Sequence, residues 1–363
     1  MQLFKLKCDD FLERDADGNY YMPAEQQVRD EAEKTHWKEV GFTLLKDWRL
    51  YLMLVPMIIV YLLWRYMPMT ELLSAFKDQN TPGAAGDSSM YDWYGLTNFD
   101  ALFFGAQSSM FWAAFKNTFV IAFYGLLFGF PFPIILALFF NEVKSNITRS
   151  ILQVCVYLPK FMSTVIITTL FIVLFRGPLD PTVNAEEGLG LVTQLLLAIF
   201  PNNEQLYNAA TSSTGGLVMS NEYFRALYQI SGIWEHGGYD SIVFFAAVIA
   251  VSPTSYEAAQ IDGAGKMQQM RYVVLPSILS TVVIMLIMKV GTLLSVGYEK
   301  VYLMTSPTNY DAGRIVSTLA NEWQQAGNNT MGIAAEMTNN LIGMILVIGA
   351  NAIARKATDV ALY

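Results

Sequence analysis

The chain has 363 residues, of which 53% are apolar and only 15% are charged, whereas about 25% of the residues of an ordinary soluble domain are charged. The net charge of −8 provides no basic face that could neutralise the phosphates of a nucleic acid. Two cysteines, Cys8 and Cys155, and two histidines, His36 and His236, are too few for a disulfide framework or a cysteine-rich metal site and argue against a zinc enzyme. This composition indicates a membrane protein.

The N-terminal segment is polar and of mixed charge. It has no basic start followed by an apolar core and a cleavage site, so it does not have the pattern of a signal peptide. Asp15, Asp17 and Asn19 have the first spacing of a calcium-binding loop but lack its remaining ligands. We therefore predict a polar cytoplasmic extension over 1–45 and a membrane domain over 46–363.

Six segments are long and apolar enough to cross a bilayer, which needs about 20 mostly apolar helical residues. They are 50–69, 117–141, 151–175, 227–251, 273–296 and 331–354. The third carries one charge, Lys160, and the fifth carries Lys289. The fourth contains Glu235 and Asp240 and is expected to be broken at Gly237-Gly238. The pattern predicts an all-α, polytopic membrane helix bundle of about six transmembrane helices.

Lysine and arginine accumulate in short loops on one side of this predicted bundle, as they do on the cytoplasmic side of membrane proteins. These residues are Lys144, Arg149, Lys160, Lys266, Arg271, Arg355 and Lys356. The longer connections, 176–226 and 297–330, contain acidic residues such as Asp180 and Glu187. We predict a multi-pass protein of the cell membrane with both termini in the cytoplasm and the long connections outside.

The sequence contains no convincing nucleotide-binding motif. Gly265-Lys266 is followed by Met267, where a phosphate-binding loop requires Ser or Thr. Gly188-Leu189-Gly190 lacks the third glycine of a dinucleotide-binding fingerprint. Because no nucleophile–base pair stands out either, we predict that the chain is not an enzyme, and any ATP must be bound by another subunit.

The loop between the fourth and fifth predicted helices has the features of a short helix of its own. Ser252 followed by Pro253 indicates a helix start, because Pro suits the first helical position and Ser can cap free amides. Ala258 and Ala259 keep one side of this helix thin, and Gly263 can end it in the left-handed conformation. Such a helix is suited to insertion into a groove on another protein.

The residues of this loop resemble the permease subunits of binding-protein-dependent ABC importers. The signature of that family is Glu-Ala-Ala, three residues, Gly, nine residues, an aliphatic residue, any residue and Leu-Pro. The chain has Glu257-Ala258-Ala259, Gly263, Val273 and Leu275-Pro276 at these spacings. Further segments resemble the sugar-type branch, closest to its oligosaccharide or complex-polysaccharide subgroup: Lys46-Asp47-Trp48, Trp93-Tyr94-Gly95, Tyr157-Leu158-Pro159 and Gly297-Tyr298-Glu299.

The resemblance extends from residue 46 to the C-terminus and implies a type I, MetI-like permease fold. It implies alternating access in a complex of two similar permeases, two ATP-binding subunits that hold ATP and Mg, and an extracellular solute-binding protein. The solute would be a carbohydrate, such as an oligosaccharide, and this chain would bind no cofactor itself. Lys160 departs from the family pattern, because many relatives carry a neutral residue after Leu-Pro.

The same resemblance assigns ATPase coupling to the loop 252–276. Its short helix would seat in a groove of the ATP-binding subunit and move the two attached membrane helices. The residues concerned are Glu257, Ala258, Ala259, Asp262, Gly263, Leu275 and Pro276.

The candidate solute path combines aromatic rings with carboxylates, because sugars stack on rings and donate hydroxyl hydrogen bonds to acids. Its residues are Trp234, Glu235, Tyr239, Asp240, Tyr298 and Glu299. The alternative is that the aromatic residues only mark the outer membrane interface. Two other functions also remain open: a secondary transporter and a membrane scaffold without an ATPase partner.

Lys289 is a cation well inside the fifth predicted helix, where an unpaired ammonium costs roughly 2.5–3.5 kcal/mol. Glu336 lies at a comparable predicted depth in the sixth helix and is the first choice of partner. Glu235 or Asp240 is the second choice. The alternative is that Lys289 reaches the outer water and pairs with no acid.

Overall fold

The structure is a computed structural model, and it describes residues 13–14, 20–21, 48–81, 90–178, 188–212 and 215–358. The chain divides into two compact units, Met1–Thr70 and Glu71–Tyr363, and each is described by itself. The predicted extension 1–45 lies almost wholly outside the described residues. Within it, β1 (Glu13–Arg14) and β2 (Tyr20–Tyr21) form a short antiparallel pair.

The first predicted span is one helical run from Trp48 to Phe76. It begins as α2 (Trp48–Tyr61), continues as the π-helix η2 (Leu62–Tyr66) and ends as the 3-10 helix η3 (Met67–Phe76), whose last six residues belong to the second unit. The run is apolar, with a mean hydropathy of 1.7. Its length and composition agree with the predicted span 50–69.

Three further helical runs in the second unit are long and apolar enough to cross a membrane: Ser108–Glu142, Lys266–Gly291 and Asn329–Lys356. Two more spans are counted if two bent helix pairs are each taken as one, which gives up to six. The runs and pairs comprise α4 (Ser108–Tyr124), η5 (Gly125–Gly129), α5 (Pro131–Glu142), α6 (Asn146–Tyr157), η6 (Leu158–Phe161), α7 (Thr164–Leu174), α10 (Phe224–Ile249), α11 (Pro253–Ile261), α12 (Lys266–Gln269), η8 (Met270–Val274), α13 (Leu275–Gly291) and α17 (Asn329–Thr358).

The third predicted span, 151–175, is not one continuous helix, and this corrects the prediction. The helical pair before and after residue 162 is bent by 97°. Pro159 has no backbone N–H to continue the α-helix, and Met162 has an extended backbone (φ −82°, ψ 151°). Ser163 then caps α7, because its hydroxyl accepts a hydrogen bond from the Val165 N–H at 3.3 Å.

The fourth predicted span shows the opposite error, because α10 continues through Gly237-Gly238 without a break. Both glycines are buried where α10 packs closely on its neighbours. A Cβ at Gly238 would lie 2.1 Å from the backbone oxygen of Val156 in α6, and one at Gly237 would lie 2.6 Å from the Phe132 ring in α5. These glycines therefore allow close helix packing rather than a break.

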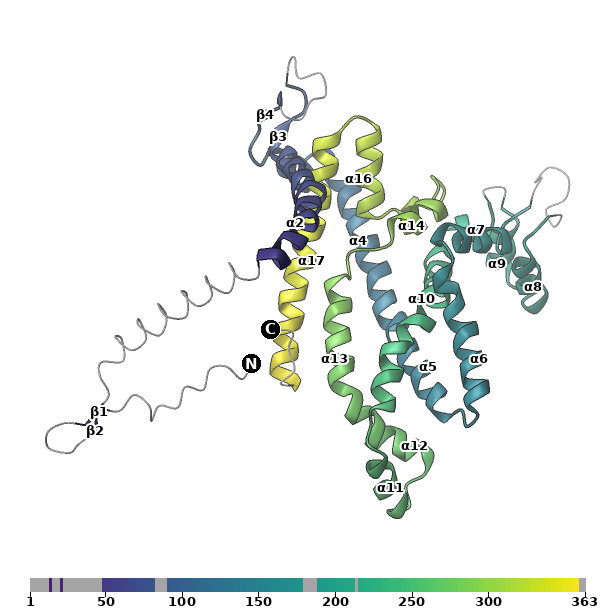
Figure 1. Cartoon of the computed structure of the whole chain (residues 1–363). Coiled ribbons are helices and arrows are strands. Elements are labelled where there is room, and N and C mark those ends of the chain that lie inside the picture. The colour runs from purple at the N-terminus through teal and green to yellow at the C-terminus, as the bar shows by residue number, and fades with distance from the viewer. Residues whose placement is uncertain are drawn as a thin grey trace. The chain divides into compact units, whose positions relative to one another are not determined.

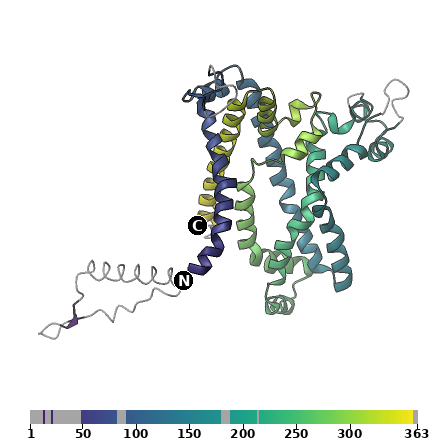
Figure 2. The ribbon, with the colours of Figure 1, turned by 45° about the horizontal axis from the view of Figure 1, so that its top comes forward.

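The remaining elements of the second unit are short. They are β3 (Lys77–Asp78), β4 (Asp92–Trp93), α3 (Thr97–Phe103), α8 (Leu191–Ile199), α9 (Glu204–Ala210), η7 (Leu217–Met219), α14 (Tyr298–Met304), α15 (Tyr310–Gly313) and α16 (Val316–Gln325). β3 and β4 pair antiparallel. Figure 1 shows α11 and α12 at one end of this unit, and α14 and α16 at the opposite end. Figure 2 shows the same separation from a second direction.

Two buried clusters stabilise the end of the unit that contains α14 and α16. The first joins α7, α10 and α14 through side chains that include Phe171, Phe224 and Val301. The second packs α16 and α17 on α3 and α4 through side chains that include Phe111 and Leu319. Because α10 belongs to the first cluster and leads directly into α11, it connects the two ends of the unit.

Candidate functional site

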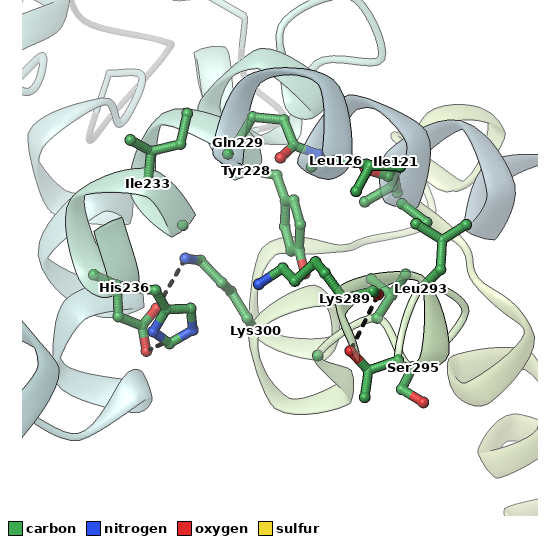
Figure 3. A pocket seen from close by; sticks show the side chains of 18 of the residues that line it. Ile121, Leu126, Tyr228, Gln229, Ile233, His236, Lys289, Leu293, Ser295 and Lys300 are labelled. Carbon is green, nitrogen blue, oxygen red and sulfur yellow. Dashed lines mark hydrogen bonds and ion pairs between the residues drawn. The ribbon is translucent and has the colours of Figure 1, made fainter. Parts of the chain in front are cut away.

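A cavity of about 590 Å³ lies beside the middle of α10. Its other walls are the run from α4 into η5 and the segment 289–300, which follows most of α13 and enters α14. Figure 3 shows the lining side chains, which come from these separate parts of the sequence. The polar lining includes Gln229, His236 and Asp240 from α10. The cavity can therefore offer hydrogen-bond donors and acceptors to a solute.

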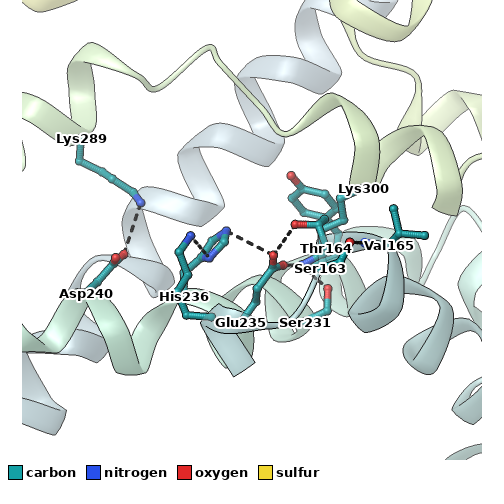
Figure 4. A network of polar contacts seen from close by, with 11 residues as sticks. Ser163, Thr164, Val165, Ser231, Glu235, His236, Asp240, Lys289 and Lys300 are labelled. Atoms are coloured by element: carbon teal, nitrogen blue, oxygen red, sulfur yellow. Dashed lines mark hydrogen bonds and ion pairs between the residues drawn. The ribbon is translucent and has the colours of Figure 1, made fainter. Parts of the chain in front are cut away.

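The most buried polar contact at the cavity is an ion pair between α10 and α14. Lys300 Nζ lies 3.0 Å from Glu235 Oε2, and the two side chains are only 5% and 3% exposed. The hydroxyl of Thr164, at the start of α7, donates a hydrogen bond to Glu235 Oε1 at 2.7 Å. Figure 4 shows this network. Both carboxylate oxygens thus already have protein partners, whereas the sequence analysis expected Glu235 to accept hydrogen bonds from a sugar.

A second, looser ion pair crosses the cavity from α13 to α10. Lys289 Nζ lies 3.9 Å from Asp240 Oδ2, and the side chains are 47% and 38% exposed. Asp240 was the second choice of partner from the sequence. The first choice, Glu336, makes no ion pair with Lys289 and lies near Ser317 of α16 instead. The reason is that Lys289 lines the cavity opposite α10, whereas Glu336 lies in the part of α17 that packs on α16.

Lys160 belongs to this same network. It lies in η6, at the bend between α6 and α7. Its Nζ is 3.1 Å from Nδ1 of His236, near the midpoint of α10. His236 Nε2 in turn lies 3.9 Å from Glu235 Oε1. Figure 4 shows His236 between its contacts to Glu235 and the neighbouring amine.

The structure separates the six residues predicted for the solute path. Glu235, Asp240, Tyr298 and Glu299 line the cavity. Trp234 is outside the lining and packs on Phe171, with ring centroids 5.9 Å apart. Tyr239 is also outside it and meets Phe161 edge to face at 6.1 Å.

Tyr298 is suited to donate a hydrogen bond into the cavity. Burial raises the pKa of its hydroxyl, and the neighbouring Tyr302 raises that pKa further. The phenol can therefore act as a hydrogen-bond donor.

Lys300, Gln229 and His236 are lining residues that sequence reasoning missed. Their positions follow from which helices pack together, and no local motif marks them.

The short helix predicted between the fourth and fifth spans is present as α11. It begins at Pro253, and Gly263 has the left-handed conformation (φ +79°) just after its end. Its capping differs from the prediction, because the Ser252 hydroxyl contacts the Thr254 hydroxyl at 2.7 Å and makes no capping hydrogen bond. The surface of α11 is open, with Ile261 87% exposed.

The predicted coupling residues divide between α11 and the start of α13. Glu257, Ala258, Asp262 and Gly263 are exposed, and Ala259 is half-buried. Leu275 and Pro276 begin α13 beside the buried Val274 and Ile278. The start of α13 is thus anchored by buried side chains, whereas the surface of α11 is not covered by other parts of this chain.

Comparison with known proteins identifies the family. A model of the family "Binding-protein-dependent transport system inner membrane component" matches residues 129–297. The polygalacturonan/rhamnogalacturonan transport system permease protein YteP of Bacillus subtilis (strain 168) is 34% identical over 90% of this chain and 94% of its own length. The chain belongs to this family of permeases.

Other relatives of the permease agree with this assignment. Protein LplB of Bacillus subtilis (strain 168) is 32% identical over 88% of the permease and 92% of its own length. A crystal structure of a bacterial ABC transporter involved in the import of the acidic polysaccharide alginate has a chain that is 34% identical, with a TM-score of 0.74. That match covers 88% of the permease and 99% of the other chain. It confirms the predicted importer permease fold.

A second crystal structure shows the alginate transporter in complex with an alginate pentasaccharide-bound periplasmic protein. One of its chains is 33% identical to the permease with a TM-score of 0.73, and the match covers 90% and 99% of the two chains. Membership of the family makes this chain the membrane component of a binding-protein-dependent importer. This family membership confirms the prediction that the chain is not the catalytic subunit. It also decides against the two alternatives, a secondary transporter and a scaffold.

Proposed function

We propose that this permease forms half of the membrane path of an ATP-driven importer for oligosaccharides. An extracellular binding protein delivers the solute, and a second, homologous permease provides the other half of the path. Two ATP-binding subunits supply the energy. The relatives support the carbohydrate class, because they include a polygalacturonan/rhamnogalacturonan permease and a chain of an alginate importer.

The observation that carries this proposal is the position of the cavity on α10. The polar lining lies beside the middle of α10, and the same helix leads into the exposed α11 through a bend of 68°. A movement imposed on α11 therefore reaches the cavity wall through one helix. In this arrangement α11 seats in the ATP-binding subunit, and Gly263 gives the chain its sharp turn after that contact.

The lining is suited to sugars because it mixes donors and acceptors. Asp240 and Glu299 accept hydrogen bonds from sugar hydroxyls, while Gln229, Lys289 and Tyr298 donate them. The apolar part of the lining, which includes Leu126 of η5 and Leu293 and Val296 before α14, offers surface on which a sugar ring can pack. The orientation that fits this mechanism has α11 and both termini in the cytoplasm and α14 and α16 at the outer end.

The test is purification of the permease with the proteins encoded beside it, followed by reconstitution into lipid vesicles. We expect an ATP-binding protein and a second permease to copurify, and vesicles with added binding protein to take up labelled oligosaccharides only with ATP. An Asp240→Asn variant should reduce uptake without preventing assembly, and a Lys144→Gln variant, outside the cavity, is its matched control. Uptake driven by a proton or sodium gradient without an ATPase would contradict the proposal.

A further inference from the structure

Lys160 is a charged residue in an unusual place. Its Nζ contacts His236, the residue near the midpoint of α10, and its side chain is exposed rather than buried in the helix packing. A charge at membrane depth is costly unless it pairs with an opposite charge or faces water and a solute path. The contact partner of Lys160 is an imidazole, so the charge is not neutralised there.

The geometry fixes the state of that imidazole. Nδ1 of His236 lies 3.1 Å from an ammonium, which can only donate, so Nδ1 must be the accepting, unprotonated nitrogen. The proton of the neutral ring is then on Nε2, the nitrogen that faces Glu235 Oε1 at 3.9 Å. His236 thus accepts this contact and brings no negative charge that could neutralise Lys160.

The acids around the cavity do not neutralise the charge of Lys160. Glu235 is held by Lys300 and Thr164, and Asp240 faces Lys289. Glu299 is exposed at the start of α14 and makes no ion pair with Lys160. Among the residues that the structure describes, no carboxylate lies within 4.0 Å of the Lys160 ammonium.

Two exposed aromatic side chains belong to residues close to Lys160 and His236 in the chain. Phe161 follows Lys160 in η6 and is 76% exposed, and its ring meets the 43% exposed ring of Tyr239 edge to face. Tyr239 is three residues beyond His236 on α10. A pair of exposed rings, together with a cation that has no acidic partner, favours a ligand that has both an apolar face and a negative charge, and an anionic sugar unit has both.

We propose that Lys160, Phe161 and Tyr239 form a subsite for an acidic sugar unit. The sugar face packs on the rings while its carboxylate accepts a charge-assisted hydrogen bond from Lys160 Nζ. His236 positions the ammonium from the other side. The subsite rests on the proposed function and makes it more specific, because it selects anionic over neutral oligosaccharides.

The experiment uses the complete importer in lipid vesicles with its binding protein. Uptake is measured for trisaccharides of galacturonate and mannuronate, for their methyl esters, and for a sulfated neutral trisaccharide. The variants are Lys160→Gln and Lys160→Arg, and the control is Lys144→Gln, which changes an exposed lysine in the connection between α5 and α6.

We expect Lys160→Gln to lower acidic trisaccharide uptake by about ten-fold or more, because a charge-assisted hydrogen bond is lost. Uptake of the methyl ester should change less than about two-fold relative to the intact importer, and Lys160→Arg should retain most of the uptake of the acid. Loss restricted to the uronates identifies a carboxylate subsite, and a loss shared by the sulfated sugar identifies a general anion subsite; both support the inference.

Three results overturn the inference. Equal losses for the acid and its ester assign Lys160 a purely structural role. An intact importer that carries only neutral oligosaccharides leaves the proposed function standing and removes the acidic subsite. An importer that carries no oligosaccharide at all refutes the proposed function itself.

Discussion

The buried ion pair between Glu235 and Lys300 predicts a large and specific effect on stability. The two charges are 3.0 Å apart and only 3% and 5% exposed, so each depends mainly on its partner rather than on water. Removing one partner of a buried pair costs about 3–5 kcal/mol, mostly because the other charge is left uncompensated. Lys300→Met should therefore be strongly destabilising, although methionine is similar in length to the lysine stem.

The exposed pair between Lys289 and Asp240 provides a control within the same cavity. Its charges are 3.9 Å apart and about half exposed, so its contribution should be at most about 1 kcal/mol. At about 2 °C per kcal/mol for a chain of this size, we expect Lys300→Met to lower the Tm by about 6 °C or more. Lys289→Met should lower it by about 2 °C or less.

The assay is thermal unfolding of the purified permease complex, followed by the loss of monodisperse protein at a fixed heating rate. The double variant Glu235→Leu with Lys300→Met should regain a large part of the lost stability, because no buried charge remains unpaired. If Lys300→Met costs no more than Lys289→Met, or if the two changes at the buried pair are additive, the reasoning from burial is refuted.

Three other predictions concern packing, coupling and topology. A Gly238→Ala variant should destabilise the permease by about 1–3 kcal/mol, measured by the same unfolding assay, because its Cβ would lie 2.1 Å from the Val156 oxygen. A Gly263→Val variant should assemble in the membrane but lose ATP-driven uptake, because a β-branched residue is strained at φ +79°. A Cβ at this position would meet nothing within 4 Å in this chain, so the fold itself has room for the side chain. Full uptake by this variant would contradict the coupling role. A cysteine label replacing Asn202 should react with an impermeant reagent in intact cells, whereas one replacing Gln268 should be protected, and the reverse pattern would invert the proposed orientation.

The sequence was sufficient for the features that depend on local composition or on a continuous motif. Apolar runs of about 20 residues located the spans, and the Glu257-Ala258-Ala259 signature with Gly263 located α11. Both rest on physical rules that act within a few residues: the thickness of the bilayer, and the ability of glycine to take a left-handed conformation.

The sequence was insufficient for features that depend on contacts between helices far apart in the chain. Gly237-Gly238 suggests a break, but the contact with Val156 in α6 shows that the glycines are needed for close packing. Lys300 looks like an outer-loop residue, and nothing near it in the chain indicates that Glu235, 65 positions earlier, is its partner. The bend at Pro159 had a local signal in the proline itself, which the prediction from apolar composition did not use.

The unbroken course of α10 has a mechanical consequence. Its 26 residues form a rod about 39 Å long at a rise of 1.5 Å per residue. A close contact of this helix, Gly238 on Val156, lies near its midpoint and is placed to act as a pivot. A tilt of about 10° around this point moves the two ends of the rod by about 3 Å in opposite directions. A push at the α11 end is thereby converted into an opposite displacement at the other end, which is the seesaw motion that opens one side of a path while it closes the other.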